Sequence, residues 1–511
     1  MTEPADTAPA APASAAHRWI GSSAEIVVSF TTAIWFACWA RNIGLDPLDR
    51  WAQVSGIAAL GFRFTVVASF LVAALVIAAK VRNGAAFDLT SRLVCAAAAG
   101  LFSGMVAGGI VVALRGTPWG LNGNEGDAND LIKWTLRARG GEDPPFAYPP
   151  LTFHLMDRYA RFRDLEIYNA VKHMEILGTA ALGPLAYLSW RLLLRPGWAL
   201  GIGLIAALPL VDVAPYKPYT SVVLITLIPL TLRMLQFVRH ADRYSHEQIA
   251  RRGVLMGFGF GVLCLLYSGW FKWSTPGVFL AALIVFPWRS RIAAGKAVLF
   301  GTLALMVFAL LAGGHALDAI DLNFQDDYHY FDVMAEPGYI AMYRNDLPGN
   351  VGPWPPLGEL AGVGLFTIIL CAGFGAVVVL GRGRTVVIGL GSLIVGCWLL
   401  RFYYARDLYV SGLVQLYPRT TAELQYCLLI SCGYAVYLAV ERAARRAPPD
   451  SVLKAPSALI GSLCGLLLLL GSAASQICDH YMPTDSKPPG TGWLAWKAHQ
   501  MLKEPPPTLT P

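Results

Sequence analysis

Long apolar segments recur along almost the whole chain, and they constrain the fold more than any other feature of the sequence. A helix needs roughly 20 apolar residues to cross the hydrocarbon core of a bilayer. Charged residues make up only 14% of the chain, well below the usual share of a soluble domain. The sequence therefore predicts an all-α polytopic membrane protein, a bundle of about thirteen transmembrane helices. The apolar runs lie at 24–40, 57–80, 93–114, 173–194, 198–214, 217–237, 253–268, 275–288, 296–314, 357–380, 385–402, 423–440 and 456–476.

Basic residues collect in alternate connections between these runs. Short cytoplasmic loops of membrane proteins carry an excess of Lys and Arg, so this pattern predicts the orientation. With the N-terminus in the cytoplasm, every basic connection lies inside. The net charge of +7 then reflects topology, and we expect no nucleic-acid partner. The basic connections are 80–92, Arg191 with Arg195, 239–252, 288–296, 382–384 and 441–454.

The chain divides into three parts around the membrane region. Residues 1–22 are rich in Ala and Pro and are expected to be a disordered cytoplasmic N-terminus. The transmembrane domain is expected over 23–476, with large external loops at 115–172 and 315–356, and 477–511 form a short external tail. All cysteines except Cys478 lie in or beside the apolar runs, so Cys478 is expected to face outward and no disulfide framework is predicted.

Carboxylates cluster in the first external loop, directly before the amphipathic segment LIKWTLR (131–137). An amphipathic helix in the membrane interface presents such carboxylates where a lipid headgroup lies. A shielded Asp or Glu there suits a general base acting on a lipid-linked substrate. The same residues, Glu125, Asp127 and Asp130, also suit helix caps and a solvated loop, and the residues alone leave both interpretations open.

Three segments together resemble the membrane-bound galactan arabinofuranosyltransferases of mycobacteria, members of the GT-C superfamily of multi-span glycosyltransferases. The segments are GDANDLIKWTLR (126–137), YPPLTFHLMDRYARF (148–162) and APYKPYTSVV (214–223). The family has a Gly-Asp pair at the start of the first external loop, an Arg further along, and a Tyr-Pro segment that carries Phe and Arg. This chain matches that pattern at Gly126, Asp127, Arg137, Tyr148, Pro149, Phe153 and Arg158.

The resemblance implies a reaction and a location. An arabinofuranosyl group would pass from decaprenyl-phosphate arabinofuranose to a cell-wall galactan acceptor with inversion, and Asp127 would be the general base. The implied partners are a polyprenyl-phosphate sugar donor, a polysaccharide acceptor and membrane lipid. The implied location is the plasma (inner) membrane, with the active site on its extracytoplasmic face. Family members are longer and end in an external domain, so the acceptor stays open here, as does another sugar such as mannose.

A phosphate leaving group needs charge stabilisation more than proton donation, so external basic residues are the candidate donor-phosphate ligands. Arg419 and Arg406 are preferred because Tyr403, Tyr404, Tyr409 and Tyr417 accompany them. Lys217 lies in a family-like segment, and Lys272 lies in GWFKWSTP. Arg401 is a further candidate in the same segment as Arg406. Each of the five could instead be a snorkelling anchor at the membrane interface.

The second external loop is rich in carboxylates and aromatic side chains, which suit a wall or lid for a sugar acceptor. We assign no metal ligands, because the loop has neither zinc spacing nor a calcium-loop pattern, although a divalent cation stays open as a cofactor. The predicted acceptor or sugar contacts from both loops are Glu125, Asp130, Tyr148, Asp326, Asp327 and Trp354.

Two other functions compete with a glycosyltransferase. A transporter or flippase for a lipid-linked sugar is expected to carry ionisable residues along a path through the membrane. The apolar runs look nearly free of such residues, which favours the enzyme. A non-enzymatic scaffold of envelope assembly would not require Asp127.

Overall fold

The computed structural model describes residues 15–81, 83–142, 148–213, 215–321, 328–329, 359–360, 363–406, 410, 413–414, 417–448, 451, 456–485 and 491–502. Helices dominate this part of the chain. They are α1 (Ala15–Ala40), α2 (Arg50–Lys80), α3 (Gly84–Ala113), α4 (Gly126–Arg139), α5 (Pro150–Arg163), α6 (Ile167–Arg191), α7 (Pro196–Val213), α8 (Pro218–Arg239), α9 (His246–Leu266), α10 (Gly269–Val285), α11 (Arg291–Asp321), α12 (Leu365–Gly381), α13 (Thr385–Ala405), α15 (Tyr417–Arg446), α16 (Pro456–Tyr481) and α17 (Gly492–Gln500), with a short 3-10 turn η1 (Ala241–Arg243).

Two very short antiparallel ladders pair segments that lie between helices. Strand β1 (Tyr328–His329) pairs with β4 (Leu413–Val414), with Tyr328 opposite Val414. Strand β2 (Glu359–Leu360) pairs with β3 (Val363–Gly364) just before α12. The first ladder brings a piece of the second large loop beside the segment that follows α13.

Each apolar run of the sequence overlaps a helix. Within the described residues, nine helices are long and apolar enough to cross a membrane. Of the other expected spans, α7 and α12 are apolar but shorter, and α6 and α10 contain 25 and 17 residues. The prediction of a helical multi-pass membrane protein is confirmed. The nine candidate spans are Gly21–Ala40, Arg50–Lys80, Gly84–Ala113, Pro218–Arg239, His246–Leu266, Arg291–Asp318, Thr385–Tyr403, Thr420–Arg446 and Pro456–Tyr481.

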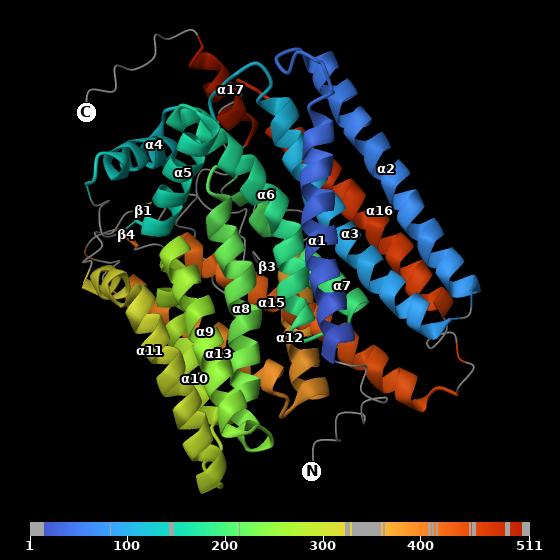
Figure 1. Cartoon of the computed structure of the whole chain (residues 1–511), viewed down its shortest axis with the longest axis vertical. Coiled ribbons are helices and arrows are strands. Elements are labelled where there is room, and N and C mark those ends of the chain that lie inside the picture. The colour runs from blue at the N-terminus through green and yellow to red at the C-terminus, as the bar shows by residue number, and fades with distance from the viewer. Residues whose placement is uncertain are drawn as a thin grey trace.

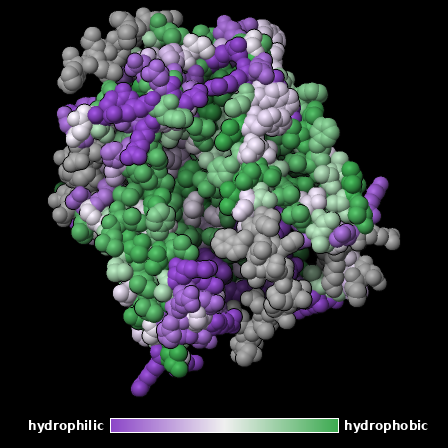
Figure 2. All heavy atoms as spheres, in the orientation of Figure 1, coloured by the Kyte–Doolittle hydropathy of each residue, from purple (hydrophilic) through white to green (hydrophobic). Residues whose placement is uncertain are grey.

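The helices of the bundle run between two polar ends. Helices α4, α5 and α17 lie at one end, and the start of α1 lies at the other, called here the N-terminal end (Figure 1). The connections α8–α9, α10–α11 and α15–α16, which carry basic clusters, lie toward the N-terminal end (Figure 1). Hydrophilic side chains gather at the two ends, with a hydrophobic belt between them (Figure 2). Such a belt is the surface that a bilayer would cover.

Helix α3 is the centre of the bundle, since 94% of its most apolar window is buried, against 17% for α2. It packs against α1, α2, α6, α7 and α16. Glycines permit the closest of these contacts. A Cβ on Gly100 would lie 2.1 Å from the carbonyl oxygen of Ser29, and one on Gly104 would lie 2.8 Å from that of Ala33. Small residues four apart let membrane helices approach this closely.

Four ionisable residues near the ends of the apolar runs are buried inside the bundle. Glu25 and Glu175 are 2% exposed, Arg401 is 1% exposed and Glu423 is fully buried. One charged residue barely changes the mean hydropathy of a long apolar run, so hydropathy does not reveal such groups. Their burial weakens the preference for the enzyme over a transporter, which rested on the scarcity of such residues.

Cys478 is also placed differently from its expected outward position. It lies in the last turns of α16, fully buried, and its Sγ is 3.4 Å from the carbonyl oxygen of Met105 in α3. Helix α16 continues beyond the expected end of the span, which carries Cys478 into the helix interface. All of the cysteines are free thiols.

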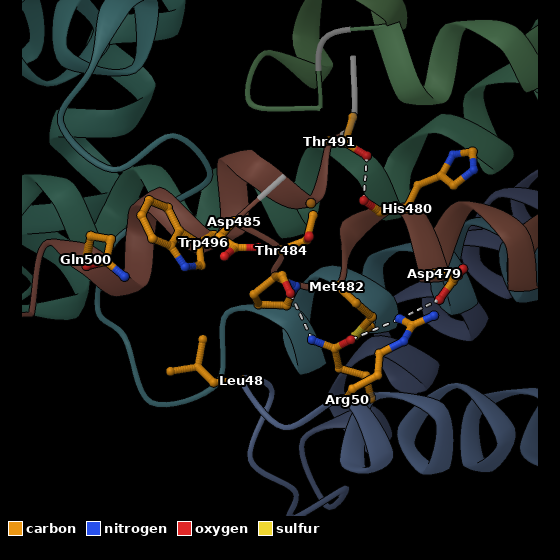
Figure 3. A pocket seen from close by; sticks show the side chains of 13 residues that line it. Leu48, Arg50, Asp479, His480, Met482, Thr484, Asp485, Thr491, Trp496 and Gln500 are labelled. Atoms are coloured by element: carbon orange, nitrogen blue, oxygen red, sulfur yellow. Dashed lines mark hydrogen bonds and ion pairs between the residues drawn. The ribbon is translucent and has the colours of Figure 1, made fainter. Parts of the chain in front are cut away.

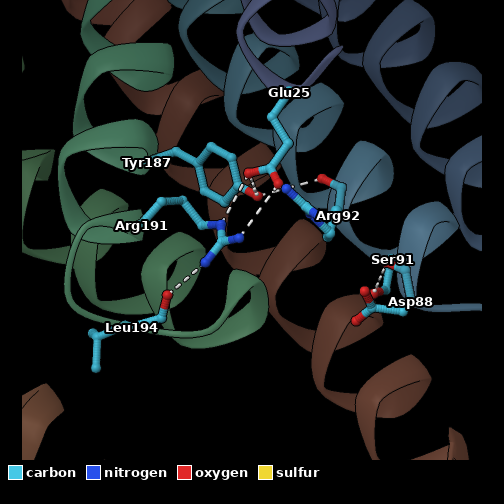
Figure 4. A network of polar contacts seen from close by, with 7 residues as sticks. All are labelled: Glu25, Asp88, Ser91, Arg92, Tyr187, Arg191 and Leu194. Carbon is cyan, nitrogen blue, oxygen red and sulfur yellow. Dashed lines mark hydrogen bonds and ion pairs between the residues drawn. The ribbon is translucent and has the colours of Figure 1, made fainter. Parts of the chain in front are cut away.

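A buried ionic network joins α1, α3 and α6 toward the N-terminal end of the bundle. The carboxylate of Glu25 accepts from Arg92 and from Arg191, whose Nε lies 2.9 Å away, and from the hydroxyl of Tyr187 at 3.0 Å (Figure 4). Arg191 also donates to the carbonyl oxygen of Leu194 at 2.7 Å. The network supplies partners for charges that would otherwise be costly to bury.

Candidate functional site

A tight turn sets the position of Asp127 at the start of α4. Asn122, Gly123 and Gly126 have φ values of 69°, 59° and 49°, in the left-handed region that glycine and asparagine tolerate best. Asn122 also donates through Nδ2 to the carbonyl oxygen of Glu125 at 2.8 Å. Asp127 then falls in the first turn of α4, where the helix dipole favours a carboxylate.

Asp127 forms an ion pair with Lys217. Lys217 is the residue directly before α8, so two segments far apart in the sequence meet at this point. The side chain of Asp127 is 41% exposed and that of Lys217 is 13% exposed. The carboxylate is thus accessible from solvent while its lysine partner is mostly covered. This pairs the predicted base with one of the predicted phosphate ligands.

Asp130 and Tyr148, both predicted to contact the acceptor, also lie together. The Tyr148 hydroxyl donates to Oδ2 of Asp130 at 3.3 Å. The Tyr148 ring lies between Trp134 and Phe153, with centroid distances of 6.1 and 6.2 Å. The contacts join α4 to the start of α5 and surround a carboxylate with aromatic rings.

A second ionic contact fixes α5 against α4. Asp157 of α5 accepts from Arg139 of α4 at 2.7 Å and from Arg161 at 2.9 Å. Burial opposes ionisation of Asp157, but the hydrogen bonds from the two arginines outweigh it and hold the pKa of Asp157 below its usual range. The two helices therefore form one unit above the bundle.

Helix α17, close to the C-terminus, holds the other side of the Asp127 loop. Lys497 pairs with Glu125 at 2.5 Å, and the amide of Asn122 donates to the carbonyl oxygen of Leu494 at 2.8 Å. Thr117 donates through its hydroxyl to Ala498 at 2.9 Å. Glu125, predicted to contact the acceptor, ties the loop to α17 through its ion pair with Lys497.

Glu175 supports the same loop from below. Its Oε2 accepts from the amide of Leu121 at 2.9 Å, while Oε1 has no hydrogen-bond partner in the described part of the chain. Lys172, almost one turn earlier in α6, donates to the carbonyl oxygens of Leu114 and Thr117 at 2.9 and 2.6 Å. Neither residue was predicted from the sequence. The available signal was a Lys and a Glu three positions apart at the start of an otherwise apolar run.

The remaining donor-phosphate candidates lie on neighbouring helices. Lys272, near the start of α10, has its Nζ 5.8 Å from the centroid of Trp273. Arg406 follows α13, is exposed, and stacks over Tyr403 at 4.2 Å. Arg419 belongs to the first turn of α15, but its side chain lies outside the described residues, as do Asp326, Asp327 and Trp354.

Arg401 is the basic residue most deeply placed in this region. It donates to the hydroxyls of Thr420 and Thr421 at 3.1 and 2.6 Å, joining the end of α13 to the start of α15. One turn further into α15, Glu423 accepts from the hydroxyl of Ser274 in α10 at 2.6 Å. The contacts hold three helices together below Lys272 and Arg406.

The structure also contains a cavity of about 850 Å³ between α17 and the start of α2 (Figure 3). None of the predicted site residues lines it. Among the described residues, no group of three or more His, Cys, Asp or Glu side chains is placed to hold a metal ion.

The geometry therefore offers a solvent-accessible carboxylate, a largely covered lysine and aromatic rings at the end of the bundle opposite the N-terminus. Such a set can accept a proton from a hydroxyl and hold an anion nearby. A comparison with protein-family models and with curated proteins found no match for this chain.

Proposed function

We propose that the chain is a membrane glycosyltransferase that transfers an arabinofuranosyl group from decaprenyl-phosphate arabinofuranose to a galactan acceptor with inversion. The observation that carries the proposal is the ion pair between Asp127 and Lys217. Its partners come from two of the three segments that resemble the arabinofuranosyltransferase family. The identities of the sugar and the acceptor follow from that resemblance. The ion pair supports the two chemical roles, a base for the acceptor hydroxyl and a cation for the donor phosphate.

In the proposed reaction, Asp127 removes the proton from the attacking acceptor hydroxyl. The hydroxyl oxygen attacks the anomeric carbon, the bond from that carbon to the phosphate oxygen breaks, and the phosphate leaves with the bonding electrons. Lys217 exchanges its contact with Asp127 for one with the donor phosphate, so donor binding releases the carboxylate for its role as base. Asp130 and Tyr148 provide polar and aromatic contacts beside the acceptor.

The proposed topology has thirteen spans, with the N-terminus inside and the site outside. The expected extra spans beyond the nine long apolar helices are α6, α7, α10 and α12. An odd number of crossings agrees with the N-terminus and α17 at opposite ends of the bundle (Figure 1). The positions of the basic connections favour a cytoplasmic N-terminus.

The test is transfer activity of the purified protein in lipid nanodiscs, with radiolabelled decaprenyl-phosphate arabinofuranose and an oligogalactan acceptor. Asp127→Asn should lower transfer by at least about 100-fold, because the amide cannot accept the hydroxyl proton. Asp164→Asn, the same change at the exposed C-cap of α5, is the matched control and should keep wild-type activity. Full activity of Asp127→Asn would remove Asp127 from the mechanism.

Glu125→Gln distinguishes between neighbouring carboxylates in that assay. Glu125 is engaged with Lys497, so its variant should keep most of the transfer activity. A loss as large as that of Asp127→Asn would move the base to Glu125. A mannosyl donor supplied in parallel tests the sugar, since preferential mannose transfer would keep the enzyme class and change the substrate.

A lipid-linked sugar transporter is the second candidate function, favoured by the ionisable side chains buried in the bundle. Glu423 and Arg401 lie on adjacent helices below the proposed site. A transporter would move a fluorescent polyprenyl-phosphate sugar between leaflets of a vesicle in the absence of any acceptor. Such movement without transfer would favour this alternative.

A further inference from the structure

We infer that the cavity between α17 and the start of α2 is a binding site for a neutral saccharide. The cavity has a volume of about 850 Å³, within the range of sites that hold a small molecule or a few sugar rings. Its walls come from α2, the turn after α16, and α17 (Figure 3). The cavity itself is independent of the proposed transfer reaction, but the choice of a galactan-type saccharide as its ligand rests on the proposed function.

Three of the polar side chains that line the cavity are suited to contact a sugar. Asp485, Trp496 and Gln500 line it, and in the described part of the chain their side chains make no hydrogen bond. They offer a carboxylate acceptor, an indole N–H donor and an amide that both donates and accepts. A sugar hydroxyl both donates and accepts, so it can use all three. The indole also provides an aromatic surface for the C–H groups of a sugar ring.

Charge argues against an anionic ligand. The cationic Arg50 is paired with Asp479 at 3.3 Å and also donates to Gln53 at 3.0 Å. The carboxylate of Asp485 has no cation beside it among the described contacts. The lining thus holds two carboxylates, Asp479 and Asp485, against the one guanidinium of Arg50, so a phosphate or a phospholipid headgroup would meet net negative charge, whereas a neutral polyol would not be repelled.

The floor of the cavity is already fixed without a ligand. Gln53 is buried and donates through Nε2 to the carbonyl oxygens of Pro47 and Pro483 at 2.8 and 2.9 Å. These bonds join the start of α2 to the turn after α16. A site held by satisfied internal contacts loses little conformational entropy when its ligand binds.

Helix α17 is a shared wall between the cavity and the Asp127 loop. Trp496 and Gln500 line the cavity, while Leu494 and Lys497 hold the loop through Asn122 and Glu125. A bound saccharide would therefore lie one helix away from the proposed site. The cavity is suited to hold a distant part of a long glycan.

The experiment is photo-crosslinking of the full-length protein in nanodiscs with neutral galacto-oligosaccharides of three to six residues that carry a diazirine. The labelled positions are mapped by mass spectrometry. Label is expected on α17 and on the turn after α16, and unlabelled oligosaccharide should compete. Trp496→Ala should raise the concentration of unlabelled oligosaccharide that halves the labelling by about tenfold. Gln500→Ala removes only a polar group and should raise that concentration by about threefold. This second variant keeps the inference testable if Trp496→Ala fails to fold.

Trp51→Ala is the matched control, because Trp51 is 82% exposed next to Arg50 but does not line the cavity. It should leave labelling unchanged. Labelling confined to the α4–α5 region, equal competition in Gln500→Ala and wild type, or displacement by inorganic phosphate would each overturn the inference. The measurement needs no donor lipid, so a failed transfer assay and a failed binding assay are separate results.

Discussion

Carboxylates meet basic side chains at both ends of the bundle, but in different surroundings. Toward the N-terminal end, the Glu25 side chain is 3% exposed and lies between Arg92 and Arg191 (Figure 4). At the opposite end, the Asp127 side chain is 41% exposed and contacts Lys217. The enclosed group is surrounded by partners it cannot exchange, whereas the accessible group can give up its partner to a ligand. The difference favours a structural role for the Glu25 network and agrees with the chemical role proposed for Asp127 and Lys217.

The largest expected effect on stability is at the enclosed end. Glu25→Ala leaves two arginines without their carboxylate in a mostly covered site, so it should lower the free energy of unfolding by about 3 kcal/mol. The thermal midpoint in detergent micelles measures this loss. Glu166→Ala is the matched control, because Glu166 is exposed before α6 and its side chain caps no amide. Equal midpoints for the two variants would show that the Glu25 network does not lock α1, α3 and α6 together.

At the accessible end, the corresponding change should affect activity instead. Lys217→Gln should lower transfer by about 30-fold, mainly as a higher KM for the donor, because a positive charge facing the phosphate is lost. The thermal midpoint should change little. Lys133→Gln, on the exposed face of α4, is the control. A large drop in stability without a change in the donor KM would make Lys217 a structural residue like Arg92.

The two pairs were not equally visible in the sequence. Apolar length predicted the helices, and the motif around Gly126 selected Asp127 together with the segment that contains Lys217. Glu25 is hidden in an apolar run, and its partners lie 67 and 166 residues away. Glu175 and Lys497 were missed for the same reason, since their contacts depend on packing between distant segments. The carboxylates and aromatic side chains of the second loop predicted a wall or lid for the acceptor, but most of its residues lie outside the described part of the chain.

A smaller effect is expected on the docking of α17 against the bundle, which should weaken as the pH falls. His499 of α17 is buried and donates through Nε2 to the carbonyl oxygen of Ala113 at 2.8 Å. Burial lowers the pKa of His499, and the nearby Lys172 acts in the same direction, while the hydrogen bond to Ala113 and the charge of Asp46 oppose the shift. The undocked histidine therefore binds a proton more readily. Docking of α17 is fully favoured above the usual histidine pKa of about 6.5 and is weakened as the pH falls through the lowered folded value.

Hydrogen exchange at the amide of Asn122, which donates to Leu494 of α17, measures this docking. After correction for intrinsic rates, its protection should fall by about 1 kcal/mol between about pH 7 and pH 5. His499→Asn should remove the pH dependence. His246→Gln, at the start of α9, should retain it. A pH dependence that survives His499→Asn would assign the titration to another group.

The smallest effect is expected where a pair is most exposed. Lys497 and Glu125 contact at 2.5 Å, but their side chains are 24% and 52% exposed, so water replaces much of the lost interaction. Lys497→Gln should therefore cost about 0.5 kcal/mol in docking of α17, measured by the same amide of Asn122. The Leu494 and Ala498 carbonyl contacts remain in the variant and should keep α17 in place. If transfer nevertheless falls as far as in Lys217→Gln, then α17 does more than hold the loop. Lys497 would then belong with Lys217 among the groups that act on the substrate, and exposure alone would no longer separate the structural pairs from the chemical ones.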